Sequence, residues 1–470
     1  MVPPAQLPDD IIAQKQPADA SSEQKSILPR LGLIAGAAVL AYLVFTLLPY
    51  DVEAKKGLAL LTFIAILWLT EALHVTITAL LVPILGVMIG FKDLTTAKAL
   101  STFADPVIFL FFGGFALATA LHAQKLDRKL ALGLIAAAGG RMGLATMYIF
   151  LATAGLSMWI SNTATAAMML PLALGLIAQM TTDKPGTKTY ILLGIAYSAS
   201  VGGLGTLVGS PPNIIAARAL DMNFAEWMKI GLPMMLILLP VVYGMLYIMF
   251  RPDFGERVSG IQVSIPWTTP RIMTIILFAV TALCWIFSNK IAAVTKIGGM
   301  DTVIALVAAV LVVSLGLATW KDVSANTDWG VLYLFGGGLT LSAILRSSGA
   351  STVLGNAVAG VMGGFTPFFV CLVVALFIVF LTEFTSNTAS AALLVPVFAA
   401  IAEQMNMPKE LLVLIIGIGA SLAFMMPVAT PPNALVFGTG HVRQRDMIKV
   451  GFCLEIIGAF ILATYAVLFL

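Results

Sequence analysis

The sequence predicts an all-α polytopic membrane protein with about 11 transmembrane helices, two re-entrant hairpins and two inverted repeats. Hydrophobic residues make up 60% of the 470-residue chain and charged residues only 10%, whereas about 25% charged residues are usual in a soluble domain. Apolar segments of about 17 to 25 residues, the length that crosses a bilayer, recur from Leu31 to the C-terminus. Several polar motifs also occur twice in the same order. The composition excludes a water-soluble fold, and the motif pairs indicate a duplication.

A polar tail, residues 1–28, precedes the first apolar segment and lacks the early basic and apolar regions of a cleaved signal peptide. Residues 29–56 are predicted to form the first span and the loop after it. The predicted crossings are 29–49, 57–73, 74–91, 103–121, 189–219, 230–250, 271–289, 301–319, 329–345, 410–440 and 447–469, and the two predicted hairpins are 144–180 and 366–404.

The distribution of basic residues predicts the orientation. If the N-terminus is cytoplasmic and neither hairpin crosses the membrane, 16 of the 26 Lys and Arg fall on the cytoplasmic side, as the positive-inside rule requires. The net charge is only +3 and these residues lie between spans, so no nucleic-acid partner is expected. Cys284, Cys371 and Cys453 lie far apart in apolar stretches, which suggests packing residues rather than disulfides or a zinc site.

An internal duplication is the most informative feature of the chain. Residues 57–250 form the first repeat and residues 271–470 the second. The matching motifs are Phe112-Gly113-Gly114 with Phe335-Gly336-Gly337, Ser161-Asn162-Thr163-Ala164 with Ser386-Asn387-Thr388-Ala389, and Ser210-Pro211-Pro212-Asn213 with Thr430-Pro431-Pro432-Asn433. Their offsets are 223, 225 and 220 residues. Five predicted crossings, an odd number, separate matching points, so the second repeat is inverted, as in many secondary transporters.

The repeated polar motifs predict broken helices at membrane depth. Proline removes a backbone donor, and Ser, Asn and Thr favour helix caps and turns. Such breaks persist in a bilayer only where they are buried or line a cavity. We expect the Ser-Asn-Thr motifs to form the tips of the hairpins 144–180 and 366–404, and residues 209–213 and 429–433 to be unwound. The helix N-termini that follow would suit an anion, and the nearby carbonyls and hydroxyls a hard cation.

The charge pattern at these breaks favours cation-coupled transport. The segments 145–180, 196–217, 376–402 and 421–440 contain no Lys, Arg or His, and Glu383 is their only acidic residue. A bound dianion would therefore lack a protein counter-charge, and an unpaired buried charge is costly. Bound Na⁺ ions would supply the missing positive charge.

Two acidic residues inside spans leave an alternative open. Glu71 and Glu383 occupy matching Leu-Thr-Glu contexts, and His74 lies close to the first. An intramembrane carboxylate is a candidate functional group, so these residues could form a proton relay. The favoured interpretation is that they form hydrogen bonds at helix ends or between helices.

The motifs resemble those of the divalent anion/sodium symporter family, most of all its bacterial INDY-type dicarboxylate transporters. The resemblance rests on the two Ser-Asn-Thr motifs, on Gly209 to Asn213 and Ala429 to Asn433, and on Leu-Thr-Glu-Phe from Leu381, and it extends from about Gly57 to the C-terminus. It implies a homodimer in which a scaffold domain holds the interface and a transport domain moves like an elevator.

The resemblance also implies the residues of the site. It places one Na⁺ site at Ser157, Ser161, Asn162 and Gly209, and a second at Thr382, Thr385, Asn387 and Ala429. The substrate carboxylates would contact Asn162, Thr163, Ser210, Ser386, Asn387, Thr388, Thr430 and Pro431. Two Asn-Thr pairs facing each other suit a molecule with a carboxylate at each end, so succinate, malate and fumarate are the expected substrates.

The leading hypothesis is Na⁺-coupled uptake of C4 dicarboxylates across a bacterial inner membrane. A sodium-independent dicarboxylate exchanger and a proton-coupled carboxylate transporter are the alternatives within the transporter class. A channel is disfavoured because paired hairpin tips describe an enclosed site better than a continuous pore. A membrane enzyme is disfavoured because no His, Cys or Lys lies near the breaks to serve as a base or nucleophile.

Overall fold

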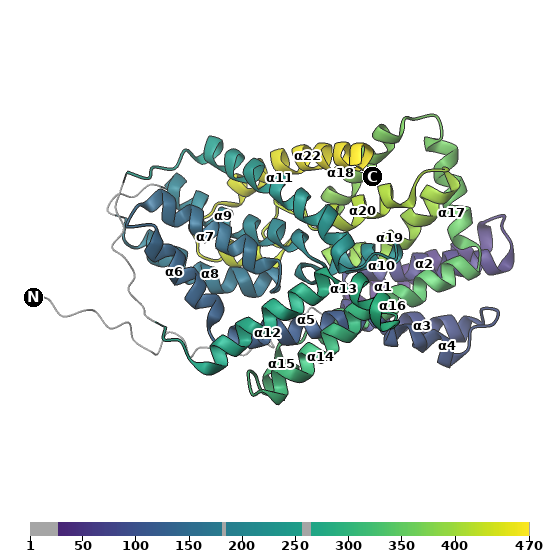
Figure 1. Ribbon diagram of the computed structural model, residues 1–470. Helices are drawn as coiled ribbons and strands as arrows, with labels where there is room; N and C mark the ends of the chain where they lie inside the picture. The colour runs from purple at the N-terminus through teal and green to yellow at the C-terminus, as the bar shows by residue number, and fades with distance from the viewer. Residues whose placement is uncertain (1–26, 181–184, 256–264, 470) are drawn as a thin grey trace, which may run out of the picture.

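The computed structural model describes residues 27–180, 185–255 and 265–469, and within these ranges the regular elements are all helices (Figure 1). The prediction of an all-α fold is therefore confirmed. The polar tail lies outside the described residues except at its last two positions, so its cytoplasmic location stays a prediction.

The helices of the first half end with a long helix before the gap at 256–264. They are α1 (Ile27–Leu47), α2 (Val52–Thr70), α3 (Val75–Ile89), α4 (Thr96–Ser101), α5 (Pro106–Ala123), α6 (Leu126–Ala137), α7 (Met142–Ser157), α8 (Asn162–Ile177), α9 (Pro185–Gly202), α10 (Pro211–Ala219) and α11 (Phe224–Phe250). Short 3-10 turns, η2 (Thr102–Ala104), η3 (Gly203–Gly205) and η4 (Leu207–Gly209), lie between them.

The second half reproduces the helix order from α2 onward. Its helices are α12 (Thr269–Ile286), α13 (Ser288–Thr295), α14 (Met300–Ser314), α15 (Trp320–Asn326), α16 (Trp329–Ser347), α17 (Ala350–Met362), α18 (Pro367–Leu381), α19 (Asn387–Gln404), α20 (Lys409–Gly419), α21 (Pro431–Phe437) and α22 (Gln444–Phe469). The predicted hairpins correspond to α7 with α8 and to α18 with α19. Each is a pair of helices joined at a Ser-Asn-Thr motif.

The length and hydropathy of the helices identify fewer membrane spans than the sequence predicted. Among the described helices, six are long and apolar enough to cross a membrane, or up to eight if each of two bent pairs counts as one span. The predicted span 74–91 contains only the 15-residue α3, and 189–219 and 410–440 are each divided by a stretch that is not α-helical. The chain is a multi-span membrane protein, whereas eleven crossings remain a prediction.

The helices pack in two groups. In one group α2 and α3 pack on α16, and α5 packs on α14. In the other group α7, α8 and α11 pack on α9, while α18 and α20 pack on α22. Figure 1 shows α7, α8 and α9 at one end of the molecule and α2, α3 and α4 at the other. The broken helices and hairpins all belong to the second group, and their polar motifs face the first.

Matching glycines bring helices of the first group into close contact. A Cβ atom on Gly113 of α5 would lie 2.5 Å from the carbonyl oxygen of Ala305 on α14, and a Cβ atom on Gly337 of α16 would lie 2.5 Å from that of Ala79 on α3. Small residues allow such close backbone approach between membrane helices. The repeated Gly-Gly motifs are therefore packing elements at equivalent helix crossings.

Replacing Gly337 with valine should destabilise the protein. The new side chain would meet the α3 backbone, and overpacking of this kind costs about 1–3 kcal/mol. We expect a lower midpoint of thermal unfolding for detergent-purified G337V than for wild type. The matched control is G360V on α17, since a Cβ atom on Gly360 would meet nothing within 4 Å. Equal midpoints for the two variants would contradict this packing role.

Candidate functional site

A cavity of about 1130 Å³ lies where the two helix groups meet. The tips of both hairpins and the starts of α10 and α21 line it, so both halves of the chain contribute to one site. All eight residues predicted to bind substrate are in its wall: Asn162, Thr163, Ser210, Ser386, Asn387, Thr388, Thr430 and Pro431. No lysine or arginine is among the described residues that line it.

Each hairpin tip begins its second helix with a serine cap. Ser161 Oγ accepts a hydrogen bond from the Ala164 N–H at 3.3 Å, and Ser386 Oγ accepts one from the Ala389 N–H at 3.4 Å. Such caps satisfy one of the unpaired N–H groups at a helix start. The Asn-Thr pairs are therefore the first residues of α8 and α19, and the helix ends that face the cavity are N-terminal and electropositive.

An oxygen cluster lies behind the tip of the first hairpin. The buried Ser157 Oγ is 2.7 Å from Asn162 Oδ1 and 2.7 Å from the Ala199 carbonyl oxygen. One hydroxyl hydrogen cannot serve both acceptors at once. Gly209, predicted to complete this site through its backbone, lines the cavity beside Asn162. The cluster has more neutral oxygen atoms than hydrogen-bond donors, and such a set of oxygens suits a small hard cation.

The second hairpin repeats this cluster. The buried Thr382 Oγ1 is 2.5 Å from Asn387 Oδ1 and 3.0 Å from the Ala420 carbonyl oxygen. Thr385 Oγ1 lies 2.7 Å from Ser390 Oγ, and Ala429 lines the cavity. The structure thus brings Ser157 to Asn162 and Thr382 to Asn387, behind the cavity wall. The other predicted cation ligands, Ser161, Gly209, Thr385 and Ala429, line the cavity.

The helix breaks lie before the proline motifs rather than within them. α9 ends at Gly202 and α10 begins at Pro211, while α20 ends at Gly419 and α21 begins at Pro431. The stretches expected to be unwound, 209–213 and 429–433, are therefore half helical. The reason is that proline lacks the N–H that the first turn of a helix leaves unpaired, so it suits the first helical position.

Two asparagines that were not among the predicted site residues hold the broken backbone. The side-chain amide of Asn213 donates to the carbonyls of Gly203 and Thr206 at 2.8 and 2.7 Å. The amide of Asn433 donates to those of Ala423 and Met426 at 3.2 and 3.1 Å. In both halves the acceptors lie ten and seven residues earlier. The signal in the sequence that could have identified these asparagines is that each ends a repeated Pro-Pro-Asn motif.

The proposed proton relay is not assembled. Glu71 and His74 are exposed in the cavity wall, and His74 Nδ1 accepts the Thr76 N–H at 3.3 Å. Glu383 is fully buried and accepts the N–H groups of Met425 and Met426 at 2.9 and 2.6 Å. No hydrogen bond joins Glu71 or His74 to Glu383 among the described residues.

A family comparison identifies the chain. The family described as the sodium:sulfate symporter transmembrane region matches residues 30–470. The chain belongs to this family. The resemblance to sodium symporters is therefore confirmed, and so are the predictions that the protein is a membrane transporter and not an enzyme.

Relatives from several organisms extend this assignment. An uncharacterized transporter from Haemophilus influenzae is 54% identical over 92% of this chain and 95% of its own length. The sodium-dependent dicarboxylate transporter SdcS from Staphylococcus saprophyticus is 33% identical over 91% of this chain and 88% of its own length. The crystal structure of the YdaH transporter from Alcanivorax borkumensis has a similar fold, with a TM-score of 0.58 and 15% identity over 84% of this chain and 98% of that one.

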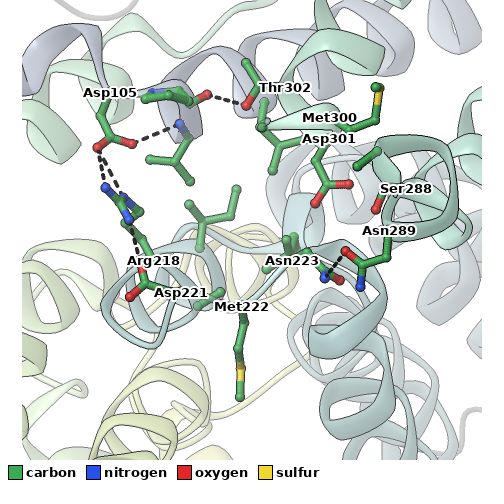
Figure 2. Close-up of a pocket in the computed structure, with 18 residues that line it drawn as sticks. Asp105, Arg218, Asp221, Met222, Asn223, Ser288, Asn289, Met300, Asp301 and Thr302 are labelled. Atoms are coloured by element: carbon green, nitrogen blue, oxygen red, sulfur yellow. Dashed lines mark hydrogen bonds and ion pairs between the residues drawn. The ribbon is translucent and has the colours of Figure 1, made fainter. Parts of the chain in front are cut away.

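A second cavity, of about 430 Å³, lies between α10, α13 and the starts of α5 and α14, and Figure 2 shows its polar side chains. Arg218 bonds to Asp105 Oδ2 at 3.0 Å and to Asp221 Oδ1 at 2.8 Å. The amide of Asn223 donates to Asn289 Oδ1 at 3.0 Å. The Arg218–Asp105 and Asn223–Asn289 contacts connect the two helix groups outside the main cavity, and neither involves a residue predicted to bind substrate or sodium.

Proposed function

We propose that this protein imports C4 dicarboxylates such as succinate, malate and fumarate together with Na⁺ across the bacterial plasma membrane. One observation carries the proposal. Two Asn-Thr pairs at helix N-termini face a single cavity whose described lining contains no lysine or arginine. A dianion with a carboxylate at each end can bind both helix starts. The positive charge that balances it then comes from bound cations.

Two Na⁺ ions occupy the oxygen clusters in this proposal. Ser157, Ser161, Asn162 and the backbone of Gly209 hold the first ion, and Thr382, Thr385, Asn387 and the backbone of Ala429 hold the second. Asn162 and Asn387 belong to both the cation sites and the substrate site. The side-chain oxygen of an asparagine can coordinate a cation while its NH₂ group donates a hydrogen bond to a carboxylate. Sodium binding would therefore orient the amides that contact the carboxylates.

The remaining contacts come from hydroxyls and the broken helices. Thr163, Ser210, Ser386, Thr388, Thr430 and Pro431 surround the substrate in this proposal. Ser210 Oγ lies 3.2 Å from Ser421 Oγ and so already connects the two halves. The sodium-dependent dicarboxylate transport named for the SdcS relatives supports the same substrate class.

Alternating access would proceed by an elevator movement. The group that contains the hairpins and broken helices would be the transport domain, the other group the scaffold, and the protein a homodimer with cytoplasmic N-termini. The polar contacts around Arg218 and Asn223 cross between the two groups. They would separate as the transport domain moves.

A sodium-independent exchanger is the main alternative, and proton coupling is the other. An exchanger without sodium would need permanently charged basic side chains to balance the substrate, and no lysine or arginine is among the described residues that line the cavity. Proton coupling through Glu71, His74 and Glu383 would need a hydrogen-bonded path, and no hydrogen bond of the described residues joins Glu383 to the other two.

Uptake into proteoliposomes tests the proposal. We expect labelled succinate to accumulate under an inward Na⁺ gradient and not when choline replaces Na⁺ or when only a proton gradient is imposed. Accumulation that requires trapped internal dicarboxylate, and not Na⁺, would instead identify an exchanger.

Replacing either asparagine with alanine should abolish measurable uptake. N162A and N387A each remove contacts to a cation and to a carboxylate, and a lost hydrogen bond to a charged group costs about 1.5–3 kcal/mol, or roughly 10- to 100-fold per contact. C371A should transport normally, because Cys371 is buried in α18 away from the cavity. Near-normal uptake by both asparagine variants, at matched protein levels, would rule out the site.

A cross-link between the helix groups should stop transport. In a background without Cys284, Cys371 and Cys453, we would introduce N223C and N289C, whose native side chains are hydrogen bonded (Figure 2). Mercuric ions that bridge the two thiols should block uptake, and dithiothreitol should restore it. Each single-cysteine variant serves as control. Continued uptake after both thiols are consumed would contradict movement between these two helix groups.

A further inference from the structure

A second buried carboxylate lies beside Glu383, and the transport proposal does not use it. Glu455 is in the middle of α22 and, like Glu383, has 0% of its surface exposed. The two side chains bond to consecutive backbone N–H groups, Glu455 to that of Phe424 and Glu383 to those of Met425 and Met426, and so lie side by side. They come from the turn after α18 and from α22, which pack against each other. Glu455 was not among the residues predicted from the sequence, although an acidic residue inside the predicted span 447–469 was a visible signal.

The two carboxylates enclose one turn of broken backbone. Glu455 Oε1 accepts the Phe424 N–H at 3.2 Å, and the oxygens of Glu383 accept the next two N–H groups, from Met425 and Met426. Both oxygens of Glu383 therefore have a donor. Glu455 Oε2 is buried and has no donor among the described residues. A buried carboxylate oxygen without a donor is costly.

The surroundings do not supply a positive charge. The ionisable side chain that approaches both carboxylates is Tyr197 of α9, and its hydroxyl already donates to the Phe424 carbonyl at 2.6 Å. Residues 230–242 of α11 and 411–419 of α20 contain no ionisable side chain, and α18 contains only Cys371, three turns before Glu383. The basic residue of α22 nearest in sequence is Lys449, six residues before Glu455.

The first half of the protein builds the same junction without acids. By the repeat offsets of 225 and 220, the positions of Glu383, Glu455 and Met425 correspond to Met158, Met235 and Gly205. Met158 and Met235 both pack against Gly205. Gly231 and Gly451 likewise contact equivalent backbone, at Leu204 and at Phe424–Met425. The fold therefore closes this junction with two methionines, and packing alone does not require the carboxylates.

We propose that Glu455 is a proton-binding site, protonated at Oε2 and donating that proton as a hydrogen bond to the Glu383 carboxylate. The proton supplies the donor that Oε2 lacks and removes one of two adjacent like charges. Ionised carboxylates this close repel each other in a medium of low dielectric. The pair then carries a single negative charge, which the three backbone N–H groups stabilise.

A proton fits this place better than a metal ion does. Sodium and other hard cations need several oxygen ligands, but three of the four carboxylate oxygens already face N–H donors. Those donors would repel a cation. The single free oxygen is enough for a proton and too little for a metal ion.

The protonated pair would hold the segment that leads to the cavity. The turn 424–426 precedes Ala429 and Thr430 by only a few residues, and Asn433 binds the Met426 carbonyl in the same turn. Loss of the proton would restore repulsion between the carboxylates and loosen this turn. Transport would then weaken at alkaline pH even though the substrate is fully ionised there.

Infrared spectroscopy of the purified full-length protein tests the site without substrate. A protonated carboxylic acid has a carbonyl stretch that ionised carboxylates lack and that shifts in D₂O. We expect such a band in wild type, lost as the pH rises from neutral to alkaline. The band should be absent from E455Q, in which the amide imitates the protonated acid, and from E383M/E455M, which copies the packing of the first half. E71Q, a matched change at an exposed glutamate in the main cavity, should retain it.

Three results would overturn the proposal. They are a wild-type spectrum without a titrating band, a band that persists in E455Q, and a band that Na⁺ removes at constant pH, which would mark a cation site. The wild-type titration decides the question even if a variant fails to fold. Because the spectra need no dicarboxylate and no ion gradient, they stand apart from the uptake experiment, and either proposal can fail alone.

Discussion

Backbone that leaves its helix inside a bilayer must find hydrogen-bond partners within the protein, and the rest of this site depends on how that constraint is met. Asn213 and Asn433 meet it by donating to two carbonyls each, from inside the helix that follows the break. This ties the start of α10 to the η3 turn and the residue after it, and the start of α21 to the stretch after α20. The position of each helix N-terminus at the cavity is thereby determined.

The cavity exists because each broken helix packs against the hairpin of the other half. α10 packs on α19, and α21 packs on α8. Neither repeat alone encloses the polar motifs that it carries. A duplicated and inverted unit thus places two equivalent helix starts opposite each other, which matches a ligand with two equivalent charged ends. The symmetry of the fold and the symmetry of the proposed substrate have the same origin.

The sequence predicted the helices best where a polar or proline residue marks a boundary. The first hairpin was expected at 144–180 and spans Met142–Ile177, because Ser161 can cap only a helix that starts there. The break before Pro211 was placed too late, since the loss of helix at Gly203–Gly209 depends on tight packing, with a Cβ on Gly209 only 2.4 Å from the Gly203 carbonyl oxygen. Glu455 was missed because its partner lies 72 residues away and only the tertiary fold brings them together.

The two halves share geometry but not chemistry behind their oxygen clusters. Ser157 and Thr382 make equivalent contacts, whereas the layer next to them is Met158 and Met235 in one half and Glu383 and Glu455 in the other. Methionine closes the junction without the cost of buried charge, so acids at these positions impose a penalty that the fold does not demand. Such a penalty persists in a protein when the group serves an interaction beyond packing. At this junction the second half can therefore bind a proton, whereas the methionines of the first half cannot.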